Sequence, residues 1–427
     1  MRRFLKSAGK SESPLSLLFQ RGEREAACSA AGNRHAQAKF VLTGATGFLG
    51  SHLMAELLRR GHAVLALGRS AGGSTLQERI ARQLDWFGLQ PASEQLQCVE
   101  ADLLKPHLGL APAAYRALCR PATFVHLASD TRFAAANRAA SLATNVGSLA
   151  AVLDFARDCS APFFHYVSTA YVFPAESALC REEPVALGEF ANIYEESKAR
   201  AELEVISRCR DLALPYSILR PSIVYGDCQT GRSNSFTALY HHVKALELIR
   251  DIYLNDLTNQ GGAKSRLSGI ERAPDGTLKL PLRIVLPRKG HLNLIPIDFF
   301  LAATLQILSA PRPDTIYHLT SRTPSTMEEL ASFCENFLGI EGIEICYGAE
   351  PGNWRPNPAE ALFNKLIEPY RPYLSDTRSF DSANLDAVAP EIVAPTLSYP
   401  IFERCMRYAV EVNWGATHRN GSGFPVR

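Results

Sequence analysis

"KFVLTGATGFLG", residues 39–50, decides the fold of this chain. A short apolar run rich in β-forming residues leads into three glycines, Gly44, Gly47 and Gly50, and the apolar residues that follow recur at helical spacing. In such a turn the first glycine permits the tight bend, the second lets the backbone approach a pyrophosphate, and the third allows close helix packing. Because phosphates bind at the N-terminus of the following helix, this strand–turn–helix order predicts a dinucleotide site.

The same alternation of strands and helices continues as far as about residue 230. Strands that are apolar throughout and separated by helices are typical of a parallel sheet covered on both faces. The sequence therefore predicts an α/β protein, with a doubly wound Rossmann sheet binding NAD(P) in residues 38–235 and a smaller C-terminal α/β substrate region in residues 236–427. Elements around residues 291–320 are expected to return to the Rossmann core. Strands are expected at 63–69, 96–103, 123–129, 162–169 and 216–226, helices at 46–61, 75–88, 139–159 and 236–258, and a mobile loop at 260–277.

Composition and charge exclude several classes of function. The formal net charge is +2, from 45 basic and 43 acidic residues, which gives no electrostatic case for binding nucleic acid. Ten scattered cysteines without ligand spacing indicate reduced thiols, a cytoplasmic location and no metal site. No transmembrane segment is expected, because no run of 18 apolar residues occurs. Residues 1–37 lack a long apolar segment, so no secretory signal is expected. They are expected to form a disordered extension; a transit peptide is the alternative, and Glu12, Glu23 and Glu25 count against it.

The end of the second strand indicates which dinucleotide is bound. A carboxylate there would bond the ribose 2′-hydroxyl of NAD, but this chain has Arg69 at that place. An arginine can instead hold a 2′-phosphate by bidentate, charge-assisted contacts, and Arg79 could supply a second guanidinium. The prediction is therefore NADPH, with NADH less favoured; the alternative is that both arginines are simply solvated. After the third strand, Asp102 is placed where a carboxylate can meet the adenine amine.

A hydroxyl, a phenol and an ammonium are expected to meet beside the nicotinamide. Thr169 ends a strand at the carboxyl edge of the sheet, where ligands bind in open α/β folds, and Tyr194 opens the next helix near that edge. Lys198 follows Tyr194 by one helical turn, so the two side chains share a face. A free tyrosine titrates near ~10, and the ammonium together with the positive nicotinamide is expected to lower this pKa toward the working range. In hydride transfer Thr169 would hold the carbonyl oxygen, Tyr194 would exchange its proton, and Lys198 would tune Tyr194 and anchor the cofactor ribose.

These motifs carry a family resemblance. "TGATGFLG", "ADL", "HLAS", "TNVGS", "HYVSTAYV", "YEESK" and "LRPSIVYG" occur in the order found in extended short-chain dehydrogenase/reductases. "VSTAYV", "GDCQTGRSN" and "NLIPIDFF" are similar to the thioester reductase and fatty acyl-CoA reductase branch, and the resemblance covers roughly residues 39–330. It implies an NADPH-dependent oxidoreductase that reduces an acyl thioester, on coenzyme A or an acyl-carrier protein, to an aldehyde. A second round would give the alcohol.

The resemblance also implies the site residues. Thr169, Tyr194 and Lys198 match the catalytic positions of the family. Two departures concern the substrate side: "YVFP" lacks a glycine that is often found there, and the last hundred residues match no pattern. The cofactor-binding positions are Gly44, Thr46, Gly47, Phe48, Leu49, Gly50, Arg69, Arg79, Asp102, Leu103, Ala128, Asn145, Lys198, Pro221 and Ile223.

Two rival functions remain open on the same fold. One is an epimerase, dehydratase or ketone/alcohol dehydrogenase acting on a sugar or steroid-like substrate. The other is a sensor that binds NADP without turning it over, although such a sensor needs neither the phenol nor its tuning. The remaining polar residues are expected to be structural: His126 and His165 as core residues, His241 and His242 without a metal, and the pairs Glu182–Glu183 and Glu195–Glu196 as solvated charge. Residues 299–308 and Trp354 are expected to pack in the core; the less favoured alternative is that they line an acyl pocket.

Overall fold

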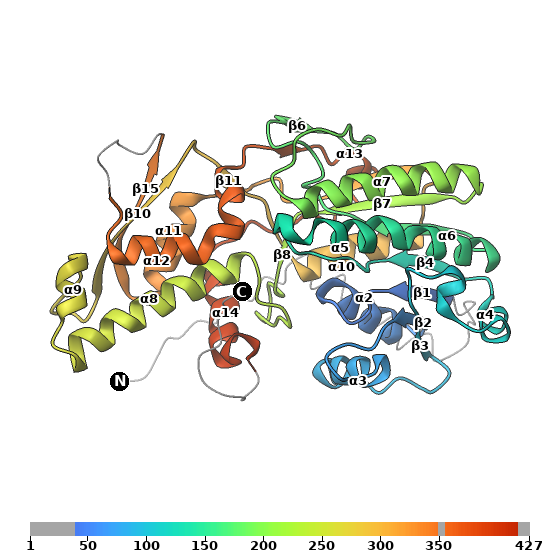
Figure 1. The fold of residues 1–427 in the computed structure, drawn as a ribbon, viewed down its shortest axis with the longest axis horizontal. Helices are drawn as coiled ribbons and strands as arrows, with labels where there is room; N and C mark the ends of the chain where they lie inside the picture. Colours follow the sequence, from blue (N-terminus) through green and yellow to red (C-terminus); the bar gives the residue numbers. More distant parts are fainter. Residues whose placement is uncertain (1–38, 349–354, 417–427) are drawn as a thin grey trace, which may run out of the picture.

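A computed structural model of the chain describes residues 39–348 and 355–416 (Figure 1). The expected N-terminal extension and Trp354 lie outside the described residues. The main sheet has seven parallel strands in the order β13-β7-β5-β4-β1-β2-β3. This arrangement confirms the predicted Rossmann fold class. The strands are β1 (Lys39–Thr43), β2 (Ala63–Gly68), β3 (Leu96–Glu100), β4 (Thr123–His126), β5 (Phe164–Val167), β7 (Tyr216–Pro221) and β13 (Thr315–Leu319).

Both faces of the sheet are buried, as the apolar strands predict. Neighbouring residues of β1 show this directly: Val41 and Leu42 are at most 1% exposed and belong to hydrophobic clusters on opposite faces. One face is covered by α2 (Phe48–Arg59), α3 (Leu76–Phe87), α10 (Ile297–Ser309) and α13 (Ala383–Val388), and the other by α4 (Pro112–Leu118), α6 (Ser148–Asp158) and α7 (Ile193–Asp211). The short helix α5 (Arg138–Leu142) packs against α7. Residues 299–308 therefore serve core packing in α10, as expected.

One helical stretch of the described chain, Ala135–Asp158, is long and apolar enough to cross a membrane by length and composition. Half of its apolar window is buried inside the protein. Val152 and Leu153 of this stretch pack into the cluster beneath the sheet. A core helix passes the same test, so this stretch is weak support for a span, and the absence of a transmembrane segment stays a prediction.

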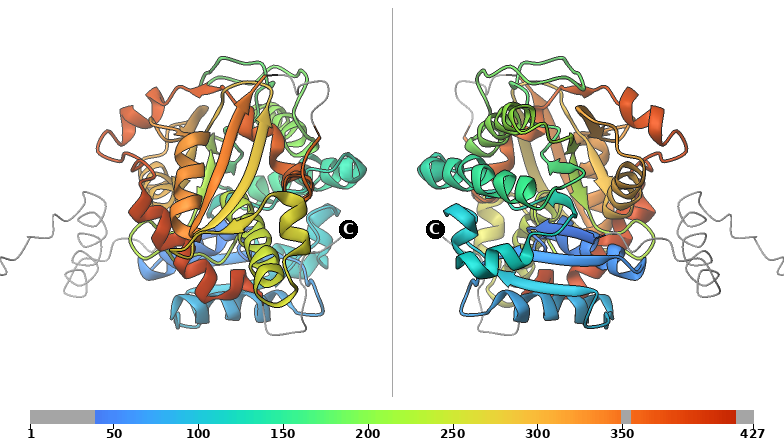
Figure 2. Two further views of the ribbon diagram at one scale, coloured as in Figure 1. Left: turned by 90° about the vertical axis from the view of Figure 1, so that its left-hand side faces the viewer. Right: turned by 90° about the vertical axis from the view of Figure 1, so that its right-hand side faces the viewer.

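A second, smaller α/β layer lies at the far end of the molecule from β1–β3 (Figures 1 and 2). Its sheet has the order β15-β10-β9. Its core contains side chains from this sheet and from the helices packed on it, and Trp414 and Phe402 are among the buried residues. The elements are α8 (Leu239–Asn259), α9 (Ala263–Ser268), β9 (Glu271–Arg272), β10 (Leu278–Leu286), α11 (Met327–Leu338), β15 (Ile340–Tyr347), α12 (Pro358–Ile367) and α14 (Tyr399–Glu411).

The expected mobile loop at 260–277 is wrong, because this segment holds α9 and β9. The carboxylate of Asp256 accepts hydrogen bonds from the backbone N–H of Ser265, at 2.8 Å, and from its hydroxyl, at 2.7 Å. These bonds fix the start of α9 against α8. The segment is rich in glycine and polar residues, and this composition gives no sign of the contact between Asp256 and Ser265.

Three short strand pairs lie outside the two larger sheets. The parallel pair of β8 and β12 extends directly from β7, so the chain between the two layers is held by backbone hydrogen bonds. The elements are β6 (Leu179–Cys180) with β16 (Ser379–Phe380), β8 (Ile223–Tyr225) with β12 (Leu294–Pro296), and β11 (His291–Leu292) with β14 (Ser325–Thr326). The short helical segments Pro106–Gly109, Ala135–Asn137, Ala143–Gly147, Glu368–Ser375 and Asn413–Gly415 complete the fold.

Candidate active site

The glycine turn lies where the strand order reverses, between β1 and β4. Gly44 has a φ of +74°, and a Cβ at this residue would lie 2.7 Å from the backbone nitrogen of Ala128. A Cβ at Gly50 would lie 2.2 Å from the carbonyl oxygen of Gly44. Gly47 precedes α2 without a side-chain cap on the first turn of that helix. The turn therefore presents helix N–H groups at the position where an open α/β sheet binds a phosphate.

A cavity of about 310 Å³, here called the dinucleotide cavity, opens at the carboxyl ends of β1 to β4. Eight of the predicted cofactor residues line it. Gly44 and Gly47 bring the uncapped start of α2 to this cavity, so the residues present fit the pyrophosphate of an NAD(P) molecule. The eight are Gly44, Thr46, Gly47, Arg69, Arg79, Asp102, Leu103 and Ala128.

The two predicted arginines lie together in this cavity. The guanidinium of Arg79 donates one hydrogen bond to the backbone oxygen of Arg69, at 3.0 Å, and another to the hydroxyl of Thr46, at 2.7 Å. Arg79 thereby ties the end of β2 to the glycine turn, a contact that the sequence pattern did not indicate. Asp102 accepts a bond from the N–H of Leu104 at 3.1 Å and pairs with Lys105 at 3.4 Å.

The other predicted cofactor residues do not line the dinucleotide cavity. Phe48 and Leu49 pack beside the core beneath α2. The carbonyl of Pro221 accepts the N–H of Ala170 at 2.8 Å, and Ile223 lines a different cavity, described below.

Asn145 is buried and connects three segments. Its amide oxygen accepts the N–H of Asp130 at 2.6 Å and the hydroxyl of Ser129 at 3.2 Å. Its amide nitrogen donates to the hydroxyl of Ser197 at 2.7 Å, and Ser197 lies on α7 between Tyr194 and Lys198. Asn145 therefore holds the loop after β4 against the helix that carries the phenol and the ammonium.

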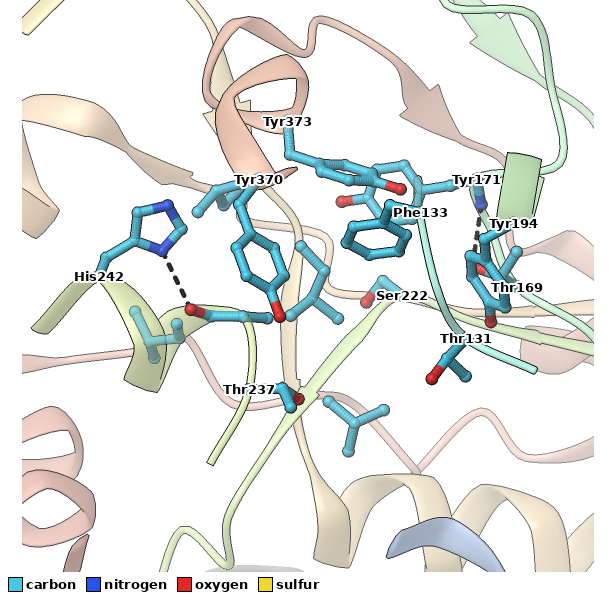
Figure 3. Close-up of a pocket in the computed structure, with 15 residues that line it drawn as sticks. Thr131, Phe133, Thr169, Tyr171, Tyr194, Ser222, Thr237, His242, Tyr370 and Tyr373 are labelled. Carbon is cyan, nitrogen blue, oxygen red and sulfur yellow. Dashed lines mark hydrogen bonds between the residues drawn. The ribbon is translucent and has the colours of Figure 1, made fainter. Parts of the chain in front are cut away.

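A second cavity, of about 180 Å³ and here called the catalytic cavity, brings Thr169 and Tyr194 together (Figure 3). Asn192 caps α7 by accepting the N–H of Glu195 at 3.0 Å, which places Tyr194 in the first turn of the helix. Thr169 and Tyr194 both line this cavity, and the hydroxyl of Thr169 accepts the N–H of Tyr171 at 3.3 Å. The hydroxyl and the phenol thus meet at one end of the cavity.

Lys198 lies behind this pair and does not line either cavity. Its ammonium donates to the carbonyl oxygen of Val167 at 2.6 Å and lies 4.3 Å from the ring centroid of Tyr166. Because Val167 precedes Thr169 by two residues, Lys198 fixes the strand end that carries Thr169 to the helix that carries Tyr194.

In the protein alone, Lys198 does not lower the pKa of Tyr194, and the part of the expectation that concerns the nicotinamide stays a prediction. Burial raises the pKa of Tyr194 to about 12, against a smaller lowering by the neighbouring hydroxyl of Thr169. Burial also lowers the pKa of Lys198 to about 7, so its positive charge is itself weakened. The sequence argument counted the nearby ammonium and omitted the larger cost of desolvating both groups. At neutral pH the phenol therefore holds its proton.

The walls of the catalytic cavity come from residues that the sequence analysis missed. The ring of Phe133 lies 6.0 Å from that of Tyr194, 5.4 Å from that of Tyr370 and 5.8 Å from that of Tyr373, measured between centroids. The repeated tyrosine in "EPYRPYLSD" was a weak signal for these walls, since both tyrosines of this segment line the cavity. The missed residues are Thr131, Phe133, Tyr171, Ser222, Val224, Thr237, Ala238, Leu239, His242, Leu292, Tyr370 and Tyr373.

Two of the expected solvated glutamates are not solvated. Glu195 is fully buried and pairs with Arg378 at 3.4 Å, while its neighbour Glu196 lies on the outer side of α7. Glu182 accepts the N–H groups of His318, at 2.7 Å, and Asn384, at 2.6 Å, and burial raises its pKa to about 7. Adjacent helical residues do face different sides, but at Glu195 one of those sides is the protein interior.

The histidines that were expected to be structural are core residues. His126 bonds the hydroxyl of Thr43 at 2.9 Å, and His165 bonds that of Ser217 at 2.8 Å. Within the described ranges, no group of three histidine, cysteine or acidic residues could hold a metal ion.

Known proteins resemble this chain along most of its length. The family model of the male sterility protein, an NAD-binding domain, matches residues 42–270, which is more than half of the chain. A nonribosomal peptide synthetase, asaC of Aspergillus flavus, is 26% identical over 380 residues, covering 82% of this chain and 34% of that protein. A protein of the linear gramicidin synthase of Brevibacillus parabrevis is 29% identical over 319 residues, covering 71% of this chain and 5% of that protein. The chain thus spans about a third or less of the length of these relatives.

Solved structures share the fold. The terminal R domain of the myxalamid PKS-NRPS pathway has a TM-score of 0.67 at 22% identity, with 90% of this chain and 93% of that chain covered. UDP-glucuronic acid 4-epimerase from Bacillus cereus, in complex with NAD, has a TM-score of 0.58 at 16% identity, with 89% and 99% covered. With the family model and the dinucleotide cavity, these findings show that the chain belongs to the male sterility protein family, whose NAD-binding domain it carries in a Rossmann fold.

Proposed function

We propose that this chain uses NADPH to reduce an acyl thioester to an aldehyde, with the acyl group carried on a carrier protein or on coenzyme A. The observation that carries the proposal is the pairing of Thr169 with a protonated Tyr194 at the end of a cavity walled by aromatic and aliphatic side chains. The names of the relatives support it, since they are peptide synthetases, and one solved structure of similar fold is a thiolation-reductase di-domain.

The residues of the chain divide the chemical work. NADPH, when bound, supplies the hydride. The hydroxyl of Thr169 positions the thioester carbonyl oxygen, and Tyr194 delivers its proton to that oxygen as negative charge develops there. Lys198 keeps the two groups in register through its bond to Val167. The hemithioacetal then collapses, so that one thioester, one NADPH and one proton give one aldehyde, one thiol and one NADP⁺.

The catalytic cavity argues against a nucleotide sugar as the substrate. Among the described residues that line it there is no lysine or arginine. A nucleotide sugar carries a diphosphate, and proteins usually bind such groups with arginine, lysine or helix N–H groups. An open phenol and hydroxyl also argue against a protein that only senses NADP.

The test is turnover of a substrate panel. Purified full-length protein would be given NADPH with acyl-CoA thioesters, acyl-carrier thioesters, nucleotide sugars and steroid ketones, and the loss of NADPH absorbance and the product masses would be followed. We expect NADPH oxidation and an aldehyde or alcohol product with thioesters alone. Absence of NADPH oxidation with every thioester would remove the proposal, and turnover of a sugar or ketone would replace it.

Arg69 offers a separate prediction about the cofactor. Substitution Arg69→Ala is expected to raise the KM for NADPH by about 10- to 100-fold, because charge-assisted bonds to a phosphate are lost, and to change the KM for NADH less than about threefold. Arg69 is the cleaner target, because Arg79 also supports the glycine turn. The matched control is Arg82→Ala, an exposed arginine on the same helix as Arg79. Equal KM changes for the two cofactors would show that Arg69 does not read the 2′-phosphate.

A further inference from the structure

A buried glutamate, Glu202, lies one helical turn beyond Lys198 on α7, just as Tyr194 lies one turn before it. Residues four apart on a helix are neighbours on one face, so α7 presents a phenol, an ammonium and a carboxylate in a row. Lys198 is 2% exposed and Glu202 is fully buried. Charges that are taken out of water are normally paired, and the carboxylate of Glu202 is placed as the counter-charge of this ammonium.

Arg220 of β7 fixes the carboxylate of Glu202. Its Nε donates to the two carboxylate oxygens at 2.9 and 3.2 Å, and its Nη2 donates to one of them at 2.6 Å. The same guanidinium also donates to the carbonyl oxygens of Arg181, at 3.1 Å, and of Glu183, at 2.9 Å. Because Arg220 is itself fully buried, these bonds hold the carboxylate inside the protein and in one orientation.

Three other titratable groups lie around Lys198, and each is uncharged at neutral pH. The ring of Tyr166 lies 4.3 Å from the ammonium, and burial raises the pKa of this phenol well above its usual value. Burial, followed by the charge of Lys198, lowers the pKa of His126 to about 3. Tyr194 keeps its proton as well, because its pKa is about 12. Among the described groups around Lys198, Glu202 therefore supplies the negative charge.

The charge of Lys198 matters because of the bond to Val167. An ammonium that donates to a carbonyl oxygen makes a charge-assisted hydrogen bond, which is roughly twice as strong as a neutral one. This bond, at 2.6 Å, holds the strand end that carries Thr169 against the helix that carries Tyr194. Burial lowers the pKa of Lys198 to about 7, and Glu202 acts in the opposite direction. Loss of the carboxylate would leave a neutral amine and a weaker bond at neutral pH.

We infer that Glu202, fixed by Arg220, keeps Lys198 positively charged in the folded protein and thereby keeps Thr169 and Tyr194 in register for proton delivery. The inference rests on the proposed function. Glu202 is not among the described residues that line either cavity, so it is a positioning residue that acts through Lys198. The value of kcat is expected to fall as the pH rises and Lys198 loses its proton, and Glu202 sets the pH at which this fall occurs.

The first test is the pH profile of kcat for the full chain, with saturating NADPH and the thioester that it reduces fastest. Glu202→Gln should move the fall of kcat to lower pH by about 1 to 2 units, the effect of losing a nearby opposite charge. Glu202→Asp keeps the charge and should move it by less than about half a unit. The matched control is Glu204→Gln, which removes a partly exposed carboxylate from the same helix and should leave the profile unchanged.

A second measurement needs neither cofactor nor thioester. Lysine in the unfolded chain titrates near ~10.4, so between pH 5 and pH 8.5, the two pH values of this experiment, the pKa of Lys198 in the folded state decides its charge. Glu202→Gln loses an attraction between two ions only where Lys198 is charged. The factor by which it raises the equilibrium constant for unfolding in urea should therefore be about 10- to 100-fold larger at pH 5 than at pH 8.5. In a Lys198→Met background this factor should be the same at both pH values.

The two measurements separate the inference from the proposed function. If a thioester is reduced, equal pH profiles for Glu202→Gln and the unmodified chain overturn the inference and leave the proposed function standing. If no thioester is reduced, the proposed function falls, and the unfolding factor decides: dependence on pH supports the charge coupling, and a constant factor overturns it. If Glu202→Gln does not fold, the double variant Glu202→Met, Arg220→Met replaces it with the same expected direction of shift, because it leaves no unpaired ion in the core.

Discussion

Replacing Tyr194 with Phe is expected to lower kcat for thioester reduction by about 100- to 10,000-fold, the range that a positioned proton donor contributes. The ring that packs against Phe133 remains, and only the hydroxyl next to Thr169 is lost. Because Tyr194 lines the catalytic cavity and not the dinucleotide cavity, the Kd for NADPH should change by less than about threefold. Steady-state kinetics and a fluorescence titration with NADPH measure the two quantities.

The matched control is Tyr370→Phe. Tyr370 is a tyrosine of the same cavity, but it lies on the wall away from Thr169 (Figure 3). Removing its hydroxyl should lower kcat by less than about fivefold. If both variants lose kcat equally, Tyr194 acts as a wall of the cavity and not as the proton donor. If Tyr194→Phe keeps full turnover, the proton reaches the carbonyl oxygen by another route.

The raised pKa of Tyr194 favours one direction of the reaction. A phenol with a pKa of about 12 is protonated at neutral pH, so it can donate a proton during reduction without first taking one up. Oxidation of an alcohol or aldehyde needs the phenolate, whose population increases as the pH rises toward that pKa. In the protein alone Tyr194 is therefore in the protonation state that the proposed reduction needs. The rate of the reverse oxidation is expected to increase as the pH rises.

Much of the fold and part of the site could be predicted because they depend on local patterns. The glycine spacing at 44, 47 and 50 dictates the turn, and the apolar strands dictate the parallel sheet. The topology of that sheet then brings its carboxyl edges together, so that Thr169 and Tyr194 meet although 25 positions separate them in the chain. The helix period alone puts Lys198 on the same face as Tyr194.

The rest could not be predicted because it depends on contacts between distant segments. Tyr370 and Tyr373 reach the catalytic cavity from a proline-rich segment far along the chain, and no periodic pattern marks their direction. The pKa of Tyr194 depends on how completely the folded chain covers it, which spacing does not reveal. The core of the small layer needs strands β10 and β15, which were not identified from the sequence.

The burial of Glu195 beside Arg378 also depends on contacts between distant segments, and it gives the second prediction with a large expected effect. Its carboxylate is fully buried beside Arg378, which is 3% exposed and also pairs with Asp376 at 2.8 Å. Substitution Arg378→Met keeps much of the volume but leaves both carboxylates without their cation. Removing one partner of a buried pair costs about 3–5 kcal/mol, so the free energy of unfolding should fall by about that amount. Denaturant unfolding, followed by circular dichroism, measures it.

The matched control is Arg288→Met, which breaks the exposed pair of Arg288 and Glu176 and should cost about 0–1 kcal/mol. The buried network also reaches the active site. Asn192, the cap of the helix that carries Tyr194, donates its amide N–H to the hydroxyl of Tyr373 at 2.8 Å, and Glu195 raises the pKa of Tyr373. A folded Arg378 variant should therefore also lose kcat, while the Arg288 variant keeps it. Equal stability losses in the two variants would mean that the Glu195–Arg378 pair behaves as surface charge, and the active-site helix would then be held by its cap and core packing alone.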